Sequence, residues 1–290
     1  MHSTWRGIVA GLLALAALAA VPALQADDSA CLMCHRDQAA KGFGLRAHGL
    51  GADPRGEQTA IGCTDCHGAS EAHAASPRAA PDFTFHGEQA GAGDEACLSC
   101  HSDAGLGHWA FSEHAGTDTG CVACHSLHTP TDPIQETGGE FAVCTSCHQQ
   151  EKHGQMKFSR HPMQEGLVKC SDCHAPHGGA AMNGLVQPTV NETCYQCHAE
   201  KRGPFLFEHE PVQDDCTHCH DPHASVNDQL LTARQPFLCQ QCHIASRHPG
   251  TLYDDDRLGG RDINIIGQSC TNCHSQVHGG NQPASSTFRR

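Results

Sequence analysis

The sequence predicts an elongated chain of mostly short helices and loops, with very little β-sheet and no conventional apolar core. Hydrophobic residues make up only 38% of the 290 residues and aromatic residues 5%, while Gly and Pro number 30 and 15. A chain of this length normally buries apolar side chains in one or two domains, and this composition favours loops instead. Cysteine is abundant, and all 20 cysteines fall in one repeated motif. Something other than side chains must therefore fill the interior.

The first residues, 1–26, have the features of a secretory signal peptide. Arg6 precedes an apolar run from Ile8 to Ala20, and small residues lead to Ala26. A membrane anchor is the alternative, but the run is shorter than the roughly 20 apolar residues that a spanning helix needs. We expect cleavage before Asp27 and an exported, soluble mature chain, 27–290.

The charge balance is acidic, with 18 basic and 32 acidic residues. Nucleic-acid binding calls for clustered Lys and Arg, and no basic stripe is present. The acidity is best interpreted as a solvated surface that keeps the protein soluble, with a docking face for a redox partner as the alternative.

Ten CxxCH motifs account for every cysteine. Zinc sites or disulfides could use paired cysteines, but His follows all ten pairs, which chance would give with a probability on the order of 10⁻¹¹. The pattern predicts ten covalently bound haem c groups, in which the motif histidine binds the iron. The predicted haem-binding residues are Cys31, Cys34 and His35; Cys63, Cys66 and His67; Cys97, Cys100 and His101; Cys121, Cys124 and His125; Cys144, Cys147 and His148; Cys170, Cys173 and His174; Cys194, Cys197 and His198; Cys216, Cys219 and His220; Cys239, Cys242 and His243; and Cys270, Cys273 and His274.

The spacing also predicts local structure at each haem. On a helical turn, residues i, i+3 and i+4 share one face, so that both thiols reach the porphyrin while the imidazole reaches the iron. Asp94, Asn191 and Ser29 precede three of the motifs and belong to the residue types that cap helix N-termini. We therefore expect each haem site to be a short helix followed by a loop.

A second set of histidines supplies candidates for the sixth iron ligand. An iron that only passes electrons needs this ligand, whereas an open position binds small molecules. The chain divides into five two-haem units beginning at Cys31, Cys97, Cys144, Cys194 and Cys239. Each unit has two extra histidines, one between its motifs and one after the second motif. In unit order these candidate distal ligands are His48 and His73, His114 and His128, His161 and His177, His209 and His223, and His248 and His278.

Other candidate ligands fit this scheme less well. His86, His108, His153 and His218 are interpreted as surface or propionate-contacting residues, with His86 as the first substitute if one assignment fails. Met33, Met156, Met163 and Met182 do not recur from unit to unit and are interpreted as packing residues. Trp109 could lie against a porphyrin, although a lone tryptophan usually serves packing. Which distal histidine serves which iron is left open by the sequence.

The repeat favours a quasi-linear haem array that transfers electrons. Successive motifs start 22 to 34 residues apart, so the haems must lie close together and supply much of the apolar interior. Potentials should be low, because bis-histidine ligation lacks the upward shift that a methionine ligand gives.

The phrases HPMQEGLVKCSDCHAPHG, NETCYQCHAEKRGPFLFEHEPVQDDCTHCHDPHAS and SCTNCHSQVHGGN make the chain similar to periplasmic decahaem cytochromes of the MtrA, DmsE and PioA type. The resemblance implies two related pentahaem halves, about 27–155 and 156–290. It also implies insertion into an outer-membrane β-barrel protein, and contact with periplasmic or inner-membrane redox proteins and an extracellular multihaem cytochrome or reductase. The absence of the long N-terminal extension of PioA-like members favours the MtrA or DmsE side.

The resemblance therefore predicts a periplasmic electron carrier, associated with the outer membrane, that serves metal or sulfoxide reduction or iron oxidation. A soluble periplasmic shuttle without a barrel remains the main alternative, since it would share every feature of the sequence. A multihaem reductase acting on nitrite, hydroxylamine or a sulfur compound is a further alternative. Such enzymes typically have a modified motif such as CxxCK or too few distal ligands, and neither is seen here.

Overall fold

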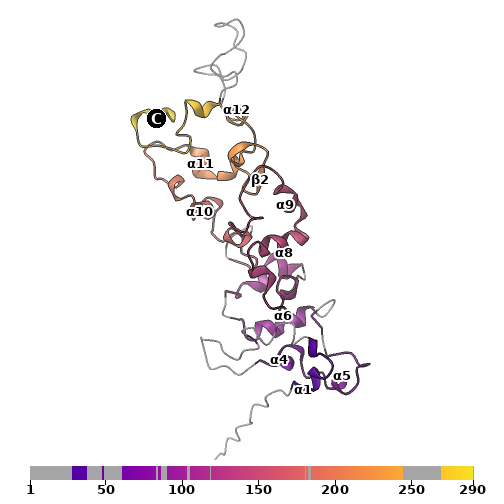
Figure 1. The fold of residues 1–290 in the computed structure, drawn as a ribbon. Helices are drawn as coiled ribbons and strands as arrows, with labels where there is room; N and C mark the ends of the chain where they lie inside the picture. Colours follow the sequence, from indigo (N-terminus) through magenta and orange to yellow (C-terminus); the bar gives the residue numbers. More distant parts are fainter. Residues whose placement is uncertain are drawn as a thin grey trace, which may run out of the picture.

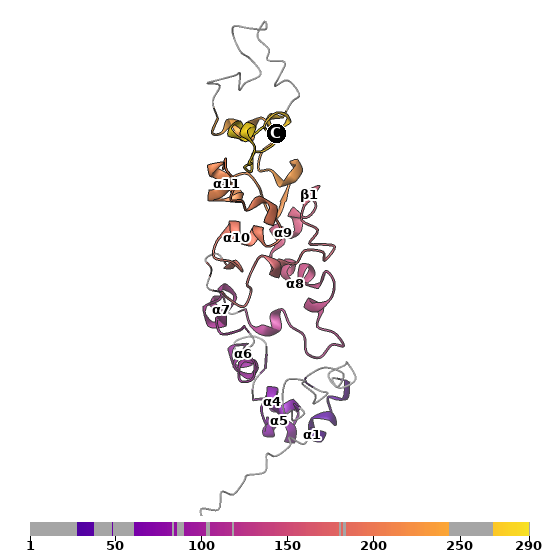
Figure 2. The ribbon, with the colours of Figure 1, turned by 90° about the vertical axis from the view of Figure 1, so that its left-hand side faces the viewer.

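The helices follow one another in sequence order along a long, narrow body (Figures 1 and 2). The computed structural model describes residues 28–37, 48, 61–82, 84–85, 90–102, 105–117, 119–179, 181, 184–243 and 269–289. The predicted signal peptide, 1–26, lies outside these residues. From α1 at one end to the segment after α12 at the other, sequence neighbours remain spatial neighbours, as expected of a repeat array.

Helices are short throughout the described residues. The α-helices are α1 (Ser29–Leu32), α4 (Cys63–His67), α5 (Glu71–Ala75), α6 (Ala90–Leu98), α7 (Glu113–Gly116), α8 (Gly139–Cys147), α9 (Gln149–Gly154), α10 (Val190–Tyr195), α11 (Glu210–Asp214) and α12 (Phe237–Gln240). The 3₁₀ helices are η3 (Trp109–Phe111), η4 (Cys121–Ala123), η5 (Pro133–Gln135), η6 (Cys170–Asp172), η8 (Ala199–Lys201), η9 (Cys216–His218), η10 (Asp228–Leu230), η11 (Cys270–Asn272) and η12 (Pro283–Thr287).

Sheet structure is limited to one small antiparallel pair in the described ranges. Strand β1 (Ser159–Arg160) pairs with β2 (Ala224–Ser225), with Ser159 opposite Ser225 and Arg160 opposite Ala224. The pair joins the third two-haem unit to the fourth, across more than 60 residues of sequence. The predicted fold class, short helices and loops with very little β-sheet, is thus confirmed.

Almost no apolar side chain is buried. Among the described residues, only Trp109 and Ala224 count as buried hydrophobic residues, whereas Phe111, Met156 and Leu167 are at least 77% exposed. Within the same residues, no helix is both long and apolar enough to cross a membrane. Since apolar burial is the main force in folding, polypeptide alone gives this chain little stability.

Each motif forms one helical turn, and the two motifs of a unit differ. First motifs belong to α-helices: α1, α6, α8, α10 and α12. Second motifs from the second unit onward form single 3₁₀ turns: η4, η6, η9 and η11. In both kinds the backbone N–H of the motif histidine donates to the carbonyl of the first cysteine, as between His125 and Cys121 at 2.9 Å and between His148 and Cys144 at 3.0 Å. The predicted helical turn is therefore present at both kinds of motif.

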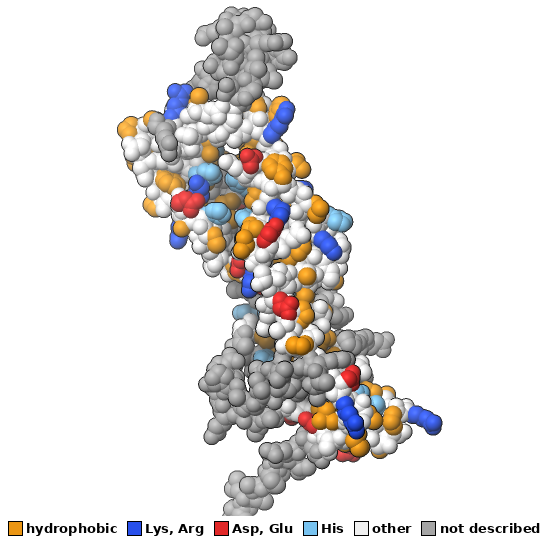
Figure 3. Space-filling model, in the orientation of Figure 1, with side chains coloured by type: hydrophobic (Ala, Val, Ile, Leu, Met, Phe, Trp, Pro, Cys, Tyr) orange, Lys and Arg blue, Asp and Glu red, His pale blue; other side chains and the backbone are white. Residues whose placement is uncertain are grey.

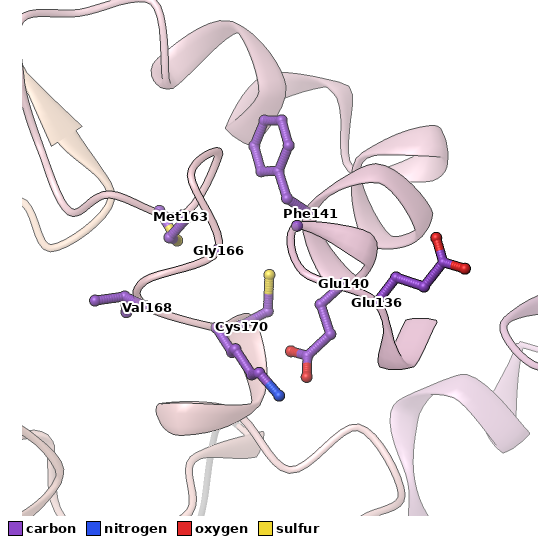
Figure 4. Close-up of a pocket in the computed structure, with 9 residues that line it drawn as sticks. Glu136, Glu140, Phe141, Met163, Gly166, Val168 and Cys170 are labelled. Carbon is purple, nitrogen blue, oxygen red and sulfur yellow. The ribbon is translucent and has the colours of Figure 1, made fainter. Parts of the chain in front are cut away.

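A side chain from the first motif's helix or the turn before it holds the second motif's turn in every unit. The acceptor oxygens and donor N–H groups are Asp28 Oδ1 and Cys63 at 2.8 Å, Asp94 Oδ1 and Cys121 at 2.8 Å, Glu140 Oε2 and Ser171 at 2.9 Å, Asn191 Oδ1 and Cys216 at 2.7 Å, and Gln235 Oε1 and Thr271 at 3.2 Å. We call these five residues the brace residues. Figure 4 shows the third, Glu140 on α8, directed toward the turn at Cys170.

The brace residues correct the capping prediction. Asp94 and Asn191 were expected to cap the helices of their own motifs, but they lie inside α6 and α10 and accept hydrogen bonds from the other motif of the unit. Thr189 caps α10 instead, accepting from the N–H of Glu192 at 3.1 Å. Ser29 is the first residue of α1, and Asp28 precedes it. The sequence identifies side chains that accept hydrogen bonds, but the backbone N–H groups that donate to them lie 25 to 35 residues further along the chain.

Replacing Asn191 with Ala should destabilise the haem-loaded protein by about 1–3 kcal/mol, because the half-buried N–H of Cys216 and two carbonyls would lose their partner. Asn191 is 7% exposed and donates to the carbonyls of Val212 at 2.9 Å and Gln213 at 3.1 Å. Denaturant unfolding measures the change. Glu200→Ala is the control, since the Glu200 side chain is 61% exposed, and equal unfolding midpoints for the two variants would contradict the brace.

Candidate haem-binding array

The first cysteines of the two motifs in a unit lie side by side. Thiols hydrogen-bond between Cys97 and Cys121, between Cys144 and Cys170, and between Cys194 and Cys216. The bond to Cys97 raises the pKa of the Cys121 thiol, with burial adding to the effect. Figure 4 shows the Cys170 thiol pointing toward α8, which carries Cys144. Groups attached at the paired sulfurs would therefore lie next to each other.

Contacts between units continue the row. Cys66 interacts electrostatically with Cys97 and Cys100 of the second unit, and Cys124 with Cys147 of the third. The same relation recurs further along: Cys173 with Cys194 and Cys197, and Cys219 with Cys242. The attachment points thus follow one another in sequence order along the body.

Nine motif histidines each face a histidine from the predicted distal set. The ring centroids lie 5.8 to 6.3 Å apart in all nine pairs. The pairs are His35 and His73, His67 and His128, His101 and His48, His125 and His177, His148 and His114, His174 and His223, His198 and His161, His220 and His278, and His243 and His209.

This separation fits a metal ion between the rings. Bonds from imidazole nitrogen to a transition metal are about 2 Å long, which places two rings on opposite sides of one ion with centroids about 6 Å apart. Elsewhere in the described residues, no group of three or more His, Cys, Asp or Glu side chains could hold a metal ion. Each site therefore offers two imidazoles that can bind an iron and two thiols that can attach a porphyrin, as a c-type haem requires.

The pairing follows an offset rule that the sequence did not reveal. The first motif of a unit pairs with the first extra histidine of the preceding unit: His101 with His48, His148 with His114, His198 with His161, and His243 with His209. The second motif pairs with the second extra histidine of the following unit: His67 with His128, His125 with His177, His174 with His223, and His220 with His278. Among these nine pairs of described residues, one, His35 with His73, lies within a single unit.

Three of the distal rings are oriented by backbone carbonyls in the next unit. The Nδ1 of His114 is bonded to the carbonyl of Pro176 at 3.1 Å, that of His161 to Pro222 at 2.7 Å, and that of His209 to Val277 at 3.0 Å. Each carbonyl directly precedes the second extra histidine of its unit. A carbonyl can only accept, so Nδ1 carries the proton and Nε2 keeps its lone pair for a metal.

Burial keeps several of these rings neutral. It lowers the pKa of His67 and of His177, and the facing imidazole of each pair, His128 or His125, lowers it further. Burial, together with the nearby charge of Lys201, lowers the pKa of His278 to about 4. Neutral imidazole is the form that ligates a metal, so these surroundings favour ligation.

The structure brings together nine of the ten predicted distal histidines with motif histidines. The tenth, His248, and the reserve candidate His86 lie outside the described residues. His218 is engaged through Nε2 with Asp214 at 2.7 Å, and His108 and His153 are not among the nine pairs. Figure 3 shows histidine side chains gathered around a hollow on one face of the C-terminal half, near α10, α11 and β2.

Residues that orient the ligands were missed by sequence reasoning. The carbonyl acceptors are main-chain groups and leave no sequence signal, whereas the brace residues recur three or four positions before each first cysteine and could have been found. Trp109 is buried: its indole N–H donates to Asp94 at 3.2 Å, and its ring lies 6.2 Å from that of His177.

Comparison with known proteins agrees with the donor set. The family described as "Doubled CXXCH motif" matches residues 161–203 and 209–248, and the family "Cytochrome c-type protein NrfB-like" matches residues 63–141. The multiheme cytochrome MtrA of Shewanella baltica (strain OS185) is 41% identical over 269 residues, covering 90% of this chain and 80% of that protein. The cytochrome c-type protein NrfB of Escherichia coli O6:H1 is 28% identical over 163 residues, covering 50% of this chain and 85% of that protein.

Covalently bound haem requires CxxCH turns, adjoining thiols and imidazole pairs spaced for a metal, and this chain has all three. Both relatives are cytochromes. The chain therefore belongs to the family of the multihaem c-type cytochrome MtrA, binds haem c through its CxxCH motifs, and is an electron carrier.

Proposed function

We propose that this protein carries ten haem c groups, each with two histidine ligands, and passes electrons along them from one end of the body to the other. The observation that carries the proposal is the set of nine facing imidazole pairs, each joining one motif histidine to one distal histidine. The offset rule leaves His248 as the partner of His274, which completes ten pairs.

The residues perform two tasks in this function. Thioether bonds from the cysteines fix each haem next to the following one, because thiols within and between units adjoin. The Nε2 atoms of the paired histidines would hold each iron and keep substrates away from it. The haem iron supplies the reversible one-electron chemistry when it is bound. The chain's own part is to hold the haems in order and to set their potentials.

We further propose that the protein works in the periplasm as the haem wire of an outer-membrane conduit for extracellular electron transfer. Its partners would be an outer-membrane β-barrel protein, an extracellular multihaem cytochrome or reductase, and periplasmic or inner-membrane redox proteins. Support comes from the relationship to MtrA and from the narrow body, in which the attachment points run in sequence order. Similar haems conduct in either direction, so the terminal donor and acceptor decide whether metal or sulfoxide reduction or iron oxidation is served.

Replacing His161 with Ala should convert one low-spin haem into a high-spin haem, because His161 faces His198 in the next unit. Electron paramagnetic resonance of the oxidised protein measures the change, and mass analysis of native protein should give ten haems. His153→Ala is the matched control, since His153 is not among the facing pairs, and it should leave every haem low-spin. A wholly low-spin H161A protein, or native protein with open irons, would refute the ligand assignment.

A conduit subunit should copurify with a large β-barrel protein from detergent-solubilised outer membrane, whereas a shuttle should appear as a free monomer in the periplasmic extract. Affinity purification of the native, haem-loaded chain followed by mass spectrometry distinguishes the two. Recovery only as a free periplasmic monomer would overturn the conduit while leaving the wire intact.

A further inference from the structure

The motif histidine His125 has a buried carboxylate as its partner. The Nδ1 of His125 donates to the carboxylate of Asp132 at 2.7 Å, and the second carboxylate oxygen accepts from the N–H of Ser126 at 3.1 Å. Asp132 is 4% exposed and directly precedes η5. Within the described ranges it is the only acidic residue in the buried class. Its charge is therefore held in place against the ring and shielded from water.

In the fourth and fifth units, the motif histidine at the same place has a neutral partner. The Nδ1 of His220 donates to the carbonyl of Gln229 at 2.8 Å, and that of His274 to the carbonyl of Thr287 at 2.6 Å. Carboxylates also lie near the distal ring of His223, where Glu151 is 3.0 Å away and 36% exposed, and near the motif ring of His198, where Glu200 is 3.8 Å away and 61% exposed. Solvent screens the charge of both exposed carboxylates. The buried carboxylate thus sets His125 apart.

The chemical effect of such a partner follows from the charge it places on the ring. A carboxylate that accepts the imidazole N–H makes the opposite nitrogen a stronger electron donor. In a water-poor site the negative charge also acts at closer to full strength. Both effects stabilise ferric over ferrous iron, which lowers the reduction potential of a haem held by that ring.

We propose that Asp132 is a positioning residue that acts through His125 to give the haem attached at Cys121 and Cys124 a lower potential than the haems on either side. The inference rests on the proposed bis-histidine wire. This haem is the fourth in sequence order. It lies between the third haem, attached at Cys97 and Cys100, and the fifth, attached at Cys144 and Cys147, so the haem of lower potential lies inside the row. An electron crossing it moves uphill and then downhill, with no net change in driving force from end to end.

The test is a redox titration of full-length, haem-loaded Asp132→Asn, followed by visible and paramagnetic resonance spectra. Asparagine keeps the size but removes the charge. One of the ten reduction steps should move upward by at least the equivalent of a tenfold change in its oxidised-to-reduced ratio, about 59 mV for one electron. The other nine steps should stay in place.

Asp214→Asn is the matched control. It also removes a carboxylate bonded to a histidine, His218, which is outside the facing pairs, and it should leave the titration unchanged. A D132N protein that holds ten haems and titrates like native protein would overturn the role of Asp132. Native protein that lacks ten low-spin haems would instead overturn the wire itself.

A native measurement covers the case in which D132N loads too few haems. His125 and Ser126 donate to different oxygens of Asp132, and in asparagine one of these oxygens is replaced by an NH₂ group, which donates. Infrared difference spectra of native protein, recorded across each reduction step, should contain at one step a carboxylate stretching band that shifts with reduction. Spectra without a carboxylate change at any step would also overturn the proposal.

Discussion

The structure depends on pairs of imidazole rings contributed by different units of the chain. Eight of the nine observed pairs join neighbouring units, and only His35 and His73 lie within one. A chain with two buried hydrophobic side chains in its described part gains little from packing. In the proposed function, ligation across units and thioether bonds within them take the place of a core and tie neighbouring units together. The same links would hold both the fold and the redox centres, so that stability and conduction would have one structural origin.

The interunit contacts also bear on the division into halves. The boundary at about 155 and 156 is crossed by the ring pair of His125 and His177, by the thiol pair of Cys144 and Cys170, and by the bond from Glu140 to Ser171. The row of adjoining cysteines therefore continues across residues 155 and 156. The contacts at this boundary are of the same kinds as those elsewhere along the row.

Much of the site could be predicted from the sequence, because haem attachment requires Cys and His at constant spacings. Nine of the ten predicted distal histidines also lie opposite motif histidines. The partner of each was not readable, since the order of the histidines along the chain fits pairing within units as well as pairing between them. The capping prediction for Asp94 and Asn191 was wrong because a good acceptor serves whichever N–H the fold brings near. Asp132 gave no signal, since one Asp in an acidic chain is distinguished only by its burial beside His125.

The offset pairing has an evolutionary consequence. Were the chain divided between its third and fourth units, His174 would be separated from His223 and His198 from His161, and each new end would carry an iron with a vacant face. Such vacancies are where small molecules bind and react. In the proposed array, loss of a neighbouring unit would therefore give an electron-transfer protein a terminal haem that can bind and react with small molecules, without the substitution of a single residue.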